Sequence, residues 1–179
     1  GIPTVIFSVF ILIFGIGIFT YIIVRRIAPL LNAAADPRLD RIMDRAKNTV
    51  RIAIFQYRQP RYLFAGILHI LIFAGFVIIS LRSITLVMFG IFEGFSLPGF
   101  EGALGNIYDL FKDLAVTIVF GSCVIAAIRR GFFQPERYSV PPKYGKGHTG
   151  EAILVLFMIS GLMVSDAIFE GSSIAAQIQ

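Results

Sequence analysis

The chain has 179 residues, of which 56% are hydrophobic and only 15% are charged. Soluble domains carry about 25% charged residues, so this composition excludes an ordinary soluble globular protein and gives no reason to expect a nucleic-acid partner. The single cysteine, Cys123, excludes an intrachain disulfide and a cysteine-rich zinc or iron-sulfur site within the chain.

Four apolar segments are each long enough to cross a bilayer, whose core takes about 20 helical residues. The first is uncharged and lacks the basic start and cleavage site of a signal peptide. The sequence therefore predicts an all-α integral membrane protein forming one membrane domain over residues 1–179, a bundle of at least four transmembrane helices. We expect the spans at about residues 2–24, 62–89, 108–128 and 151–169.

The basic residues are concentrated in two of the loops. Of the 16 lysines and arginines, nine lie within residues 25–61 and five within residues 129–148. By the positive-inside bias both loops are cytoplasmic, which puts the N-terminus outside. Asp36 and Pro37 are typical of a helix start, and apolar residues then recur at helical spacing. This pattern predicts a cytoplasmic amphipathic surface helix over about residues 37–56, facing anionic lipid headgroups or an acidic partner protein.

His69 lies within the second apolar segment, eight residues after Arg61 and so roughly 12 Å along the helix. A titratable ring at that depth either ligates a metal, often haem iron, or forms a hydrogen bond to a neighbouring helix. Gly121 lies at nearly the same depth in the third span, and Gly66 and Gly75 flank His69. These glycines either make room for a flat macrocycle or serve ordinary helix packing.

Charged residues also gather at the predicted outer ends of the spans, within about two turns of the interface. Such charges pair with one another or line a functional cavity, here a quinone pocket or a clamp for haem propionates. The residues concerned are Arg82, Asp109, Lys112, Asp113 and Asp166.

His148 precedes the fourth span by about three residues. On the helical rise its depth differs from that of His69 by roughly 10 to 15 Å, so we do not expect the two to ligate one iron. His148 is interpreted as a residue at the start of a helix, with contact to haem or quinone as the less favoured alternative.

Several segments together resemble a known family of membrane proteins. They are the first span ending in RR, QPRYLFAGILHILIFAGFVIISLRSI, YDLFKDLAV, IRRGFFQPER and EAILVLFMISGLMV. The combination is similar to the N-terminal membrane cytochrome b domain of iron-sulfur-binding reductases, related to the nitrate reductase gamma subunit and the cytochrome b subunit of heterodisulfide reductase. The resemblance implies b-type haem, menaquinone, and iron-sulfur clusters in a partner or downstream domain, with electron-transfer flavoprotein as a further partner.

By this resemblance His69 matches the haem ligand nearer the cytoplasm, while Arg82 and His148 are candidates for propionate or quinone contact. The chain departs from the nitrate reductase pattern at Ile79, where a second histidine is expected. The resemblance also implies a further helix that supplies the second axial ligand. We therefore expect a fragment that lacks a fifth helix, with that ligand beyond Gln179.

Two functions of different classes remain. In the first, the chain is the haem-binding part of a respiratory oxidoreductase in the inner membrane, passing electrons between a cytoplasmic iron-sulfur or flavoprotein partner and menaquinone. The catalytic iron-sulfur part would then lie outside this segment. In the second, the chain is a non-redox membrane anchor or transporter subunit, in which His69 packs or relays protons.

Overall fold

In the computed structural model, residues 2–33, 40–92, 94–100, 102–133 and 149–178 are described. Within these ranges the protein is all-helical and contains no strand. Four helices are long and apolar enough to cross a membrane, as the sequence predicts. They are α1 (Ile2–Leu31), α3 (Leu63–Ile91), α4 (Ala103–Ile128) and α5 (Thr149–Ile178).

The helices are longer than the apolar segments that they contain. Helix α1 continues beyond Arg25 to Leu31, and α5 continues to Ile178. Charged residues end a hydrophobic segment, but they do not end a helix, because the backbone hydrogen bonds continue past the bilayer core. The short helix α2 (Ile42–Thr49) passes into a π-helical turn, Val50–Ile54. The predicted start of this surface helix at Asp36 and Pro37 lies outside the described residues, but Asp40 and Arg41 form a turn, with Arg41 at a φ of 48°. The described helix therefore begins at Ile42, later than the expected residue 37.

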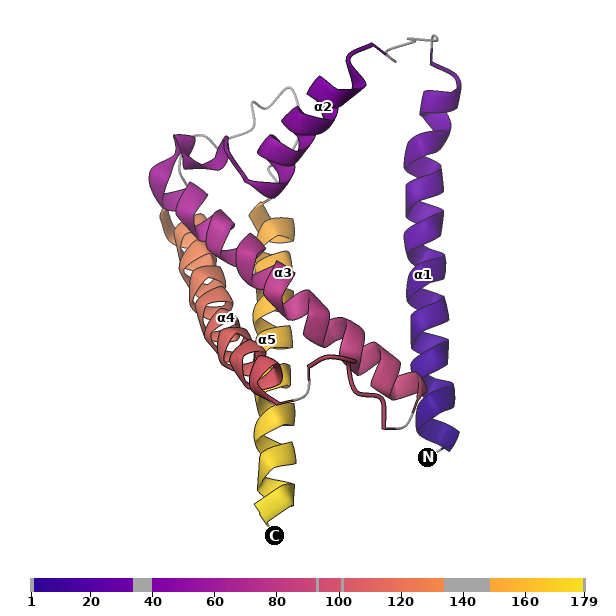
Figure 1. Cartoon of the computed structure of the whole chain (residues 1–179). Coiled ribbons are helices and arrows are strands. Elements are labelled where there is room, and N and C mark those ends of the chain that lie inside the picture. The colour runs from indigo at the N-terminus through magenta and orange to yellow at the C-terminus, as the bar shows by residue number, and fades with distance from the viewer. Residues whose placement is uncertain (1, 34–39, 93, 101, 134–148, 179) are drawn as a thin grey trace.

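Helices α3, α4 and α5 form a bundle in which α4 packs against both of its neighbours, whereas α1 stands apart (Figure 1). Helix α1 meets α3 near the N-terminal end of α1, where Gly90 approaches Ser8. A Cβ atom at Gly90 would lie 2.9 Å from the Ser8 Oγ atom. No residue in the most apolar part of α1 is fully buried by protein. Its side chains therefore face the space that lipid would occupy.

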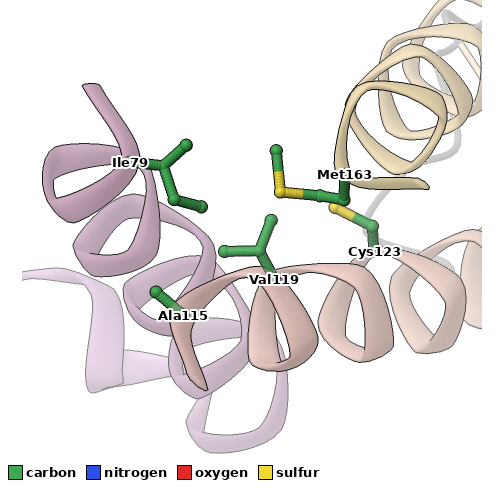
Figure 2. Packing of buried hydrophobic residues seen from close by; sticks show 5 residues of the cluster. All are labelled: Ile79, Ala115, Val119, Cys123 and Met163. Atoms are coloured by element: carbon green, nitrogen blue, oxygen red, sulfur yellow. The ribbon is translucent and has the colours of Figure 1, made fainter. Parts of the chain in front are cut away.

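The core of the bundle lies between α3, α4 and α5. Figure 2 shows Val119 of α4 between Ile79 of α3 and Met163 of α5. Ala115, Val119 and Cys123 recur at intervals of four residues, so they lie along one face of α4. This spacing explains why α4 is the central helix: it presents one continuous buried stripe to both neighbours.

Helices α3 and α4 approach each other closely at Gly75. A Cβ atom at this position would lie 2.2 Å from the Val119 Cγ2 atom and 3.5 Å from the carbonyl oxygen of Ala115. Only glycine leaves room for Val119 here, as is common where membrane helices pack through small residues.

The two ends of the bundle differ in chemistry. One end, called the basic end, comprises the start of α3, the end of α4 with Arg129 and Arg130, the start of α5, and α2 (Figure 1). The opposite end comprises the end of α3, the loop that follows it and the start of α4. The residues of α2 and of the turn Val50–Ile54 are exposed, so neither packs into the bundle.

We predict that Gly75→Ala destabilises the folded protein by about 1 to 3 kcal/mol, because the new methyl group overpacks the contact with Val119. The sequence has no tryptophan, so loss of helicity followed by circular dichroism in detergent is the suitable measurement. Gly15→Ala is the matched control, because no atom lies within 4 Å of its added Cβ. Adding Val119→Ala to Gly75→Ala should restore part of the loss. Equal stability of the Gly75 and Gly15 variants would contradict the packing argument.

Candidate functional site

A cavity of about 400 Å³ lies at the basic end, between α3, α4 and α5. Each helix contributes residues that lie one turn apart on a single face. The lining residues are Ala65, Leu68, His69 and Ile72 from α3, Ala126 with Arg129 and Arg130 from the end of α4, and Ala152, Val155 and Leu156 from α5. The volume is within the range of small-molecule and cofactor sites. Three alanines, one from each helix, keep the walls apart.

His69 is the one histidine among the described residues, and its side chain is exposed rather than packed. In the described part of the chain no group forms a hydrogen bond or an ion pair with its imidazole. The alternative of a hydrogen bond from His69 to a neighbouring helix therefore finds no partner there. A polar ring within an apolar span is unfavourable without a partner, so the cavity is the place where a ligand would compensate it.

Arg129 and Arg130 bring positive charge to the cavity that holds His69. They follow α4 in a π-helical turn, Arg129–Phe133, and the guanidinium of Arg129 lies 5.6 Å from the centre of the Phe64 ring. The sequence indicates these two arginines only as the end of a span. Whether these arginines line a cavity depends on how α4 packs against its neighbours. The local sequence pattern does not show that packing.

The three glycines predicted to make room for a cofactor have different surroundings. At Gly66 a Cβ atom would lie 2.1 Å from the carbonyl oxygen of Gln59, so this glycine admits the preceding turn of the chain. Gly75 admits Val119, as described above. At Gly121 an added Cβ would meet nothing within 4 Å. Helix and loop packing thus accounts for Gly66 and Gly75, and a cofactor role for any of the three stays a prediction.

A second polar site lies towards the opposite end and centres on Lys112 of α4. Its side chain is only 1% exposed. The ammonium group forms a short hydrogen bond to Glu170 Oε1 of α5 and a second one, of 2.6 Å, to Oε2. It also lies 3.3 Å from Asp113 Oδ1 and 3.7 Å from Asp109 Oδ1. Glu170 was not predicted, because it directly follows the apolar segment expected to end at residue 169.

Arg82 of α3 and Asp166 of α5 form the other half of this polar site. The Arg82 Nε atom lies 3.7 Å from Asp166 Oδ1, which is too far for a hydrogen bond. Both atoms are buried and have no hydrogen-bond partner among the described residues. Of the two alternatives for these charges, pairing with one another is observed: Arg82 pairs with Asp166 across α3 and α5, and Lys112 pairs with Glu170 across α4 and α5. A role in a quinone pocket or a propionate clamp stays a prediction. We call the six side chains the ion cluster: Arg82, Asp109, Lys112, Asp113, Asp166 and Glu170.

The structure keeps Arg82 away from the His69 cavity. Thirteen residues of α3 separate them, a helical rise of roughly 20 Å. Arg82 could therefore contact only a different group, at the level of the ion cluster, and such a contact stays a prediction. His148, the other candidate for propionate or quinone contact, lies outside the described residues.

Comparison with known proteins does not assign the chain to a family. No protein-family model, no curated protein and no solved structure matches the chain.

We predict that Lys112→Met lowers the free energy of unfolding by about 3 kcal/mol, because it leaves the half-buried Glu170 carboxylate without its cation. The double variant Lys112→Met/Glu170→Gln should regain at least about 1 kcal/mol, because it removes both partners. Denaturant titration in detergent, with helicity as the signal, measures both.

Asp109→Asn is the control for this pair, because the Asp109 side chain is 62% exposed and lies at the longest of the three Lys112 distances. We expect a change of no more than about 1 kcal/mol. Strictly additive effects of the Lys112 and Glu170 substitutions would show that the two side chains are not coupled.

Proposed function

We propose that this chain is a haem b-binding membrane domain of a quinone-linked oxidoreductase. The observation that carries the proposal is His69, an imidazole without a protein partner among the described residues, on the wall of a cavity between three helices. In this role His69 would supply a ligand to the haem iron. Bound haem b supplies reversible one-electron oxidation and reduction of its iron.

The residues around His69 fit such a group in three respects. Ala65, Ala126 and Ala152 place small side chains on all three walls of the cavity, which favours a flat ring. Leu68, Ile72 and the α5 side chains supply apolar contact and exclude water. Arg129 and Arg130 supply guanidinium groups for carboxylates such as propionates. Among the described residues no three metal-binding side chains converge.

Each part of the chain then has a task. Helix α3 holds the imidazole at a fixed depth, because its backbone hydrogen bonds leave only side-chain rotations free. Arg129 and Arg130 offset negative charge at the end of the cavity where the helices leave the apolar layer. The apolar walls keep the local dielectric low, which raises the effect of each charge on the potential of a bound redox group.

A neighbouring hollow of about 560 Å³ suits the quinone in this proposal. It is lined by Phe64, Ile125, Ile128, Arg129 and Phe133, so it shares Arg129 with the His69 cavity. Its walls are apolar except for the guanidinium, which can donate a hydrogen bond to a quinone carbonyl oxygen. A quinone here lies closer to His69 than one at the ion cluster, and electron transfer weakens with distance. The electron-carrying iron-sulfur or flavoprotein partner would approach the basic end, which we infer to be cytoplasmic.

The ion cluster favours the alternative function, a non-redox transporter or anchor subunit. Ionisable side chains within membrane helices often belong to ion pathways or proton relays, and here they come from three helices. The alternative predicts a purified protein without haem, so the absorption spectrum separates the two functions.

We predict that the purified protein carries haem with a Soret absorption band, and that His69→Ala abolishes or strongly reduces its haem content. The span remains apolar, so the variant should still insert into the membrane. The measurement is the haem-to-protein ratio after purification. An unchanged ratio would remove His69 from the site.

A second pair of variants tests the cavity without touching the ligand. Ala152→Leu should lower haem content, because the larger side chain projects into the cavity between the helices. Ala167→Leu is the matched control, since Ala167 is exposed on the same helix and does not line the cavity. Equal haem content in both variants would argue against this cavity as the haem site.

We further predict that the basic end faces the cytoplasm. A cysteine introduced at Asn48 of α2 should react with an impermeant thiol reagent only after the cells are opened. One introduced at the exposed Ser96 should react in intact cells. The native Cys123 is 0% exposed and so gives little background. Labelling of the Asn48 variant from outside would reverse the orientation.

A further inference from the structure

The connection between α2 and α3 is a fixed turn at the basic end. Gln56 has a positive φ of 51° and is 8% exposed, and its Nε2 donates a 2.7 Å hydrogen bond to the carbonyl oxygen of Ala53. The backbone N–H of Gln59 donates a 2.9 Å hydrogen bond to the carbonyl oxygen of Gln56. A 3₁₀ turn, Gln59–Arg61, then packs on α3, because Gly66 leaves room for the Gln59 carbonyl. The arginines that follow Gln56 are therefore carried on a backbone that is held in place.

This turn borders a hollow of about 730 Å³, lined by Tyr57, Arg58 and Arg61. A third guanidinium lies close by, because Arg51 stacks over the Tyr57 ring at 4.0 Å from its centre. Stacking places Arg51 against a wall of the hollow and limits its rotation. We call this feature the arginine hollow, defined by Arg51, Tyr57, Arg58 and Arg61.

The arginine hollow has an excess of positive charge. In the described part of the chain neither Arg58 nor Arg61 forms an ion pair with a carboxylate. Two arginines at the start of α2 differ: Arg45 lies 2.8 Å and Arg41, which precedes the helix, 3.5 Å from carboxylate oxygens of Asp40. Two uncompensated guanidiniums around one hollow favour an anion, and the planar guanidinium binds phosphate oxygens in pairs.

The position of the hollow decides which anion fits. It directly precedes Leu63, where the membrane-spanning helix α3 begins. The first side chains of α3, Leu63 and Phe64, are 72% and 56% exposed, so an apolar surface lies beside the charged one. A soluble phosphate would use only the arginines. A phospholipid would use both surfaces, with its phosphate on the arginines and its acyl chains along α3.

We propose that the arginine hollow is a binding site for the headgroup phosphate of an anionic phospholipid. The site is independent of haem, because none of its residues lines the His69 cavity. Arg58 and Arg61 hold the phosphate, and Tyr57 lies at the level of the headgroups, where tyrosine is enriched in membrane proteins. Such a lipid fixes the depth at which α3 enters the bilayer.

The test compares two double variants of the full chain that each remove two positive charges. Arg58→Gln/Arg61→Gln changes the hollow. Arg41→Gln/Arg45→Gln changes exposed arginines that are paired with Asp40. The proteins are reconstituted in phosphatidylcholine with a minor fraction of phosphatidylglycerol, and the phosphatidylglycerol retained per protein after extraction is counted by native mass spectrometry. Helicity and thermal transition in detergent establish that each variant is folded.

We expect the hollow variant to retain about tenfold less phosphatidylglycerol than the unmodified chain, and the control to differ by less than about twofold. Arg58→Lys/Arg61→Lys should fall between them, because lysine keeps the charge but loses paired hydrogen bonding. Equal losses of phosphatidylglycerol in the two glutamine variants would show that general surface charge causes the effect, and would overturn the proposal. Unchanged retention of phosphatidylglycerol in the folded hollow variant would also overturn it.

Discussion

The approach of α3 to α4 at Gly75 and Val119 is the contact on which the rest of the bundle depends. In a bilayer the helices gain nothing from leaving water, so close packing has to supply the attraction that a hydrophobic core supplies elsewhere. A glycine facing a β-branched side chain gives that packing without a void. Val119 then meets Ile79 and Met163 on its other sides, so one small residue sets the spacing of three helices.

That spacing separates two kinds of polar chemistry along one bundle. At the basic end the helices leave a cavity that is lined by two arginines and by an imidazole without a partner among the described residues. Towards the opposite end, Lys112 and Arg82 meet carboxylates from α4 and α5. Buried charges that hold helices together need partners on every side, whereas a ligand site needs a group whose partner is missing. By this criterion the ion cluster is mainly structural at Lys112, and His69 is the better candidate for binding.

Much of the architecture could be predicted because the bilayer imposes a length on each apolar segment. The depth of His69 followed from the same arithmetic. The residues that line the cavity with His69 could not be predicted. Helix α3 is apolar on all sides, so it has no periodicity that would show which face is turned inward. Glu170 was missed for a related reason: hydropathy marks where an apolar segment ends, but α5 continues and returns a carboxylate to Lys112.

The position of α1 has a consequence for the way the domain responds to its membrane. Its contact with α3 lies at Ser8 and Gly90, towards one end, and no residue in its most apolar part is fully buried by protein. Packing therefore fixes the position of one end of α1 but not the tilt of the helix. Its uncharged stretch, residues 2–24, is about 35 Å long, slightly more than the bilayer core. Tilting is one way in which a helix accommodates such a mismatch, and little packing opposes it in α1. A thinner bilayer would therefore increase the tilt of α1 more readily than it would change the packed bundle of α3, α4 and α5.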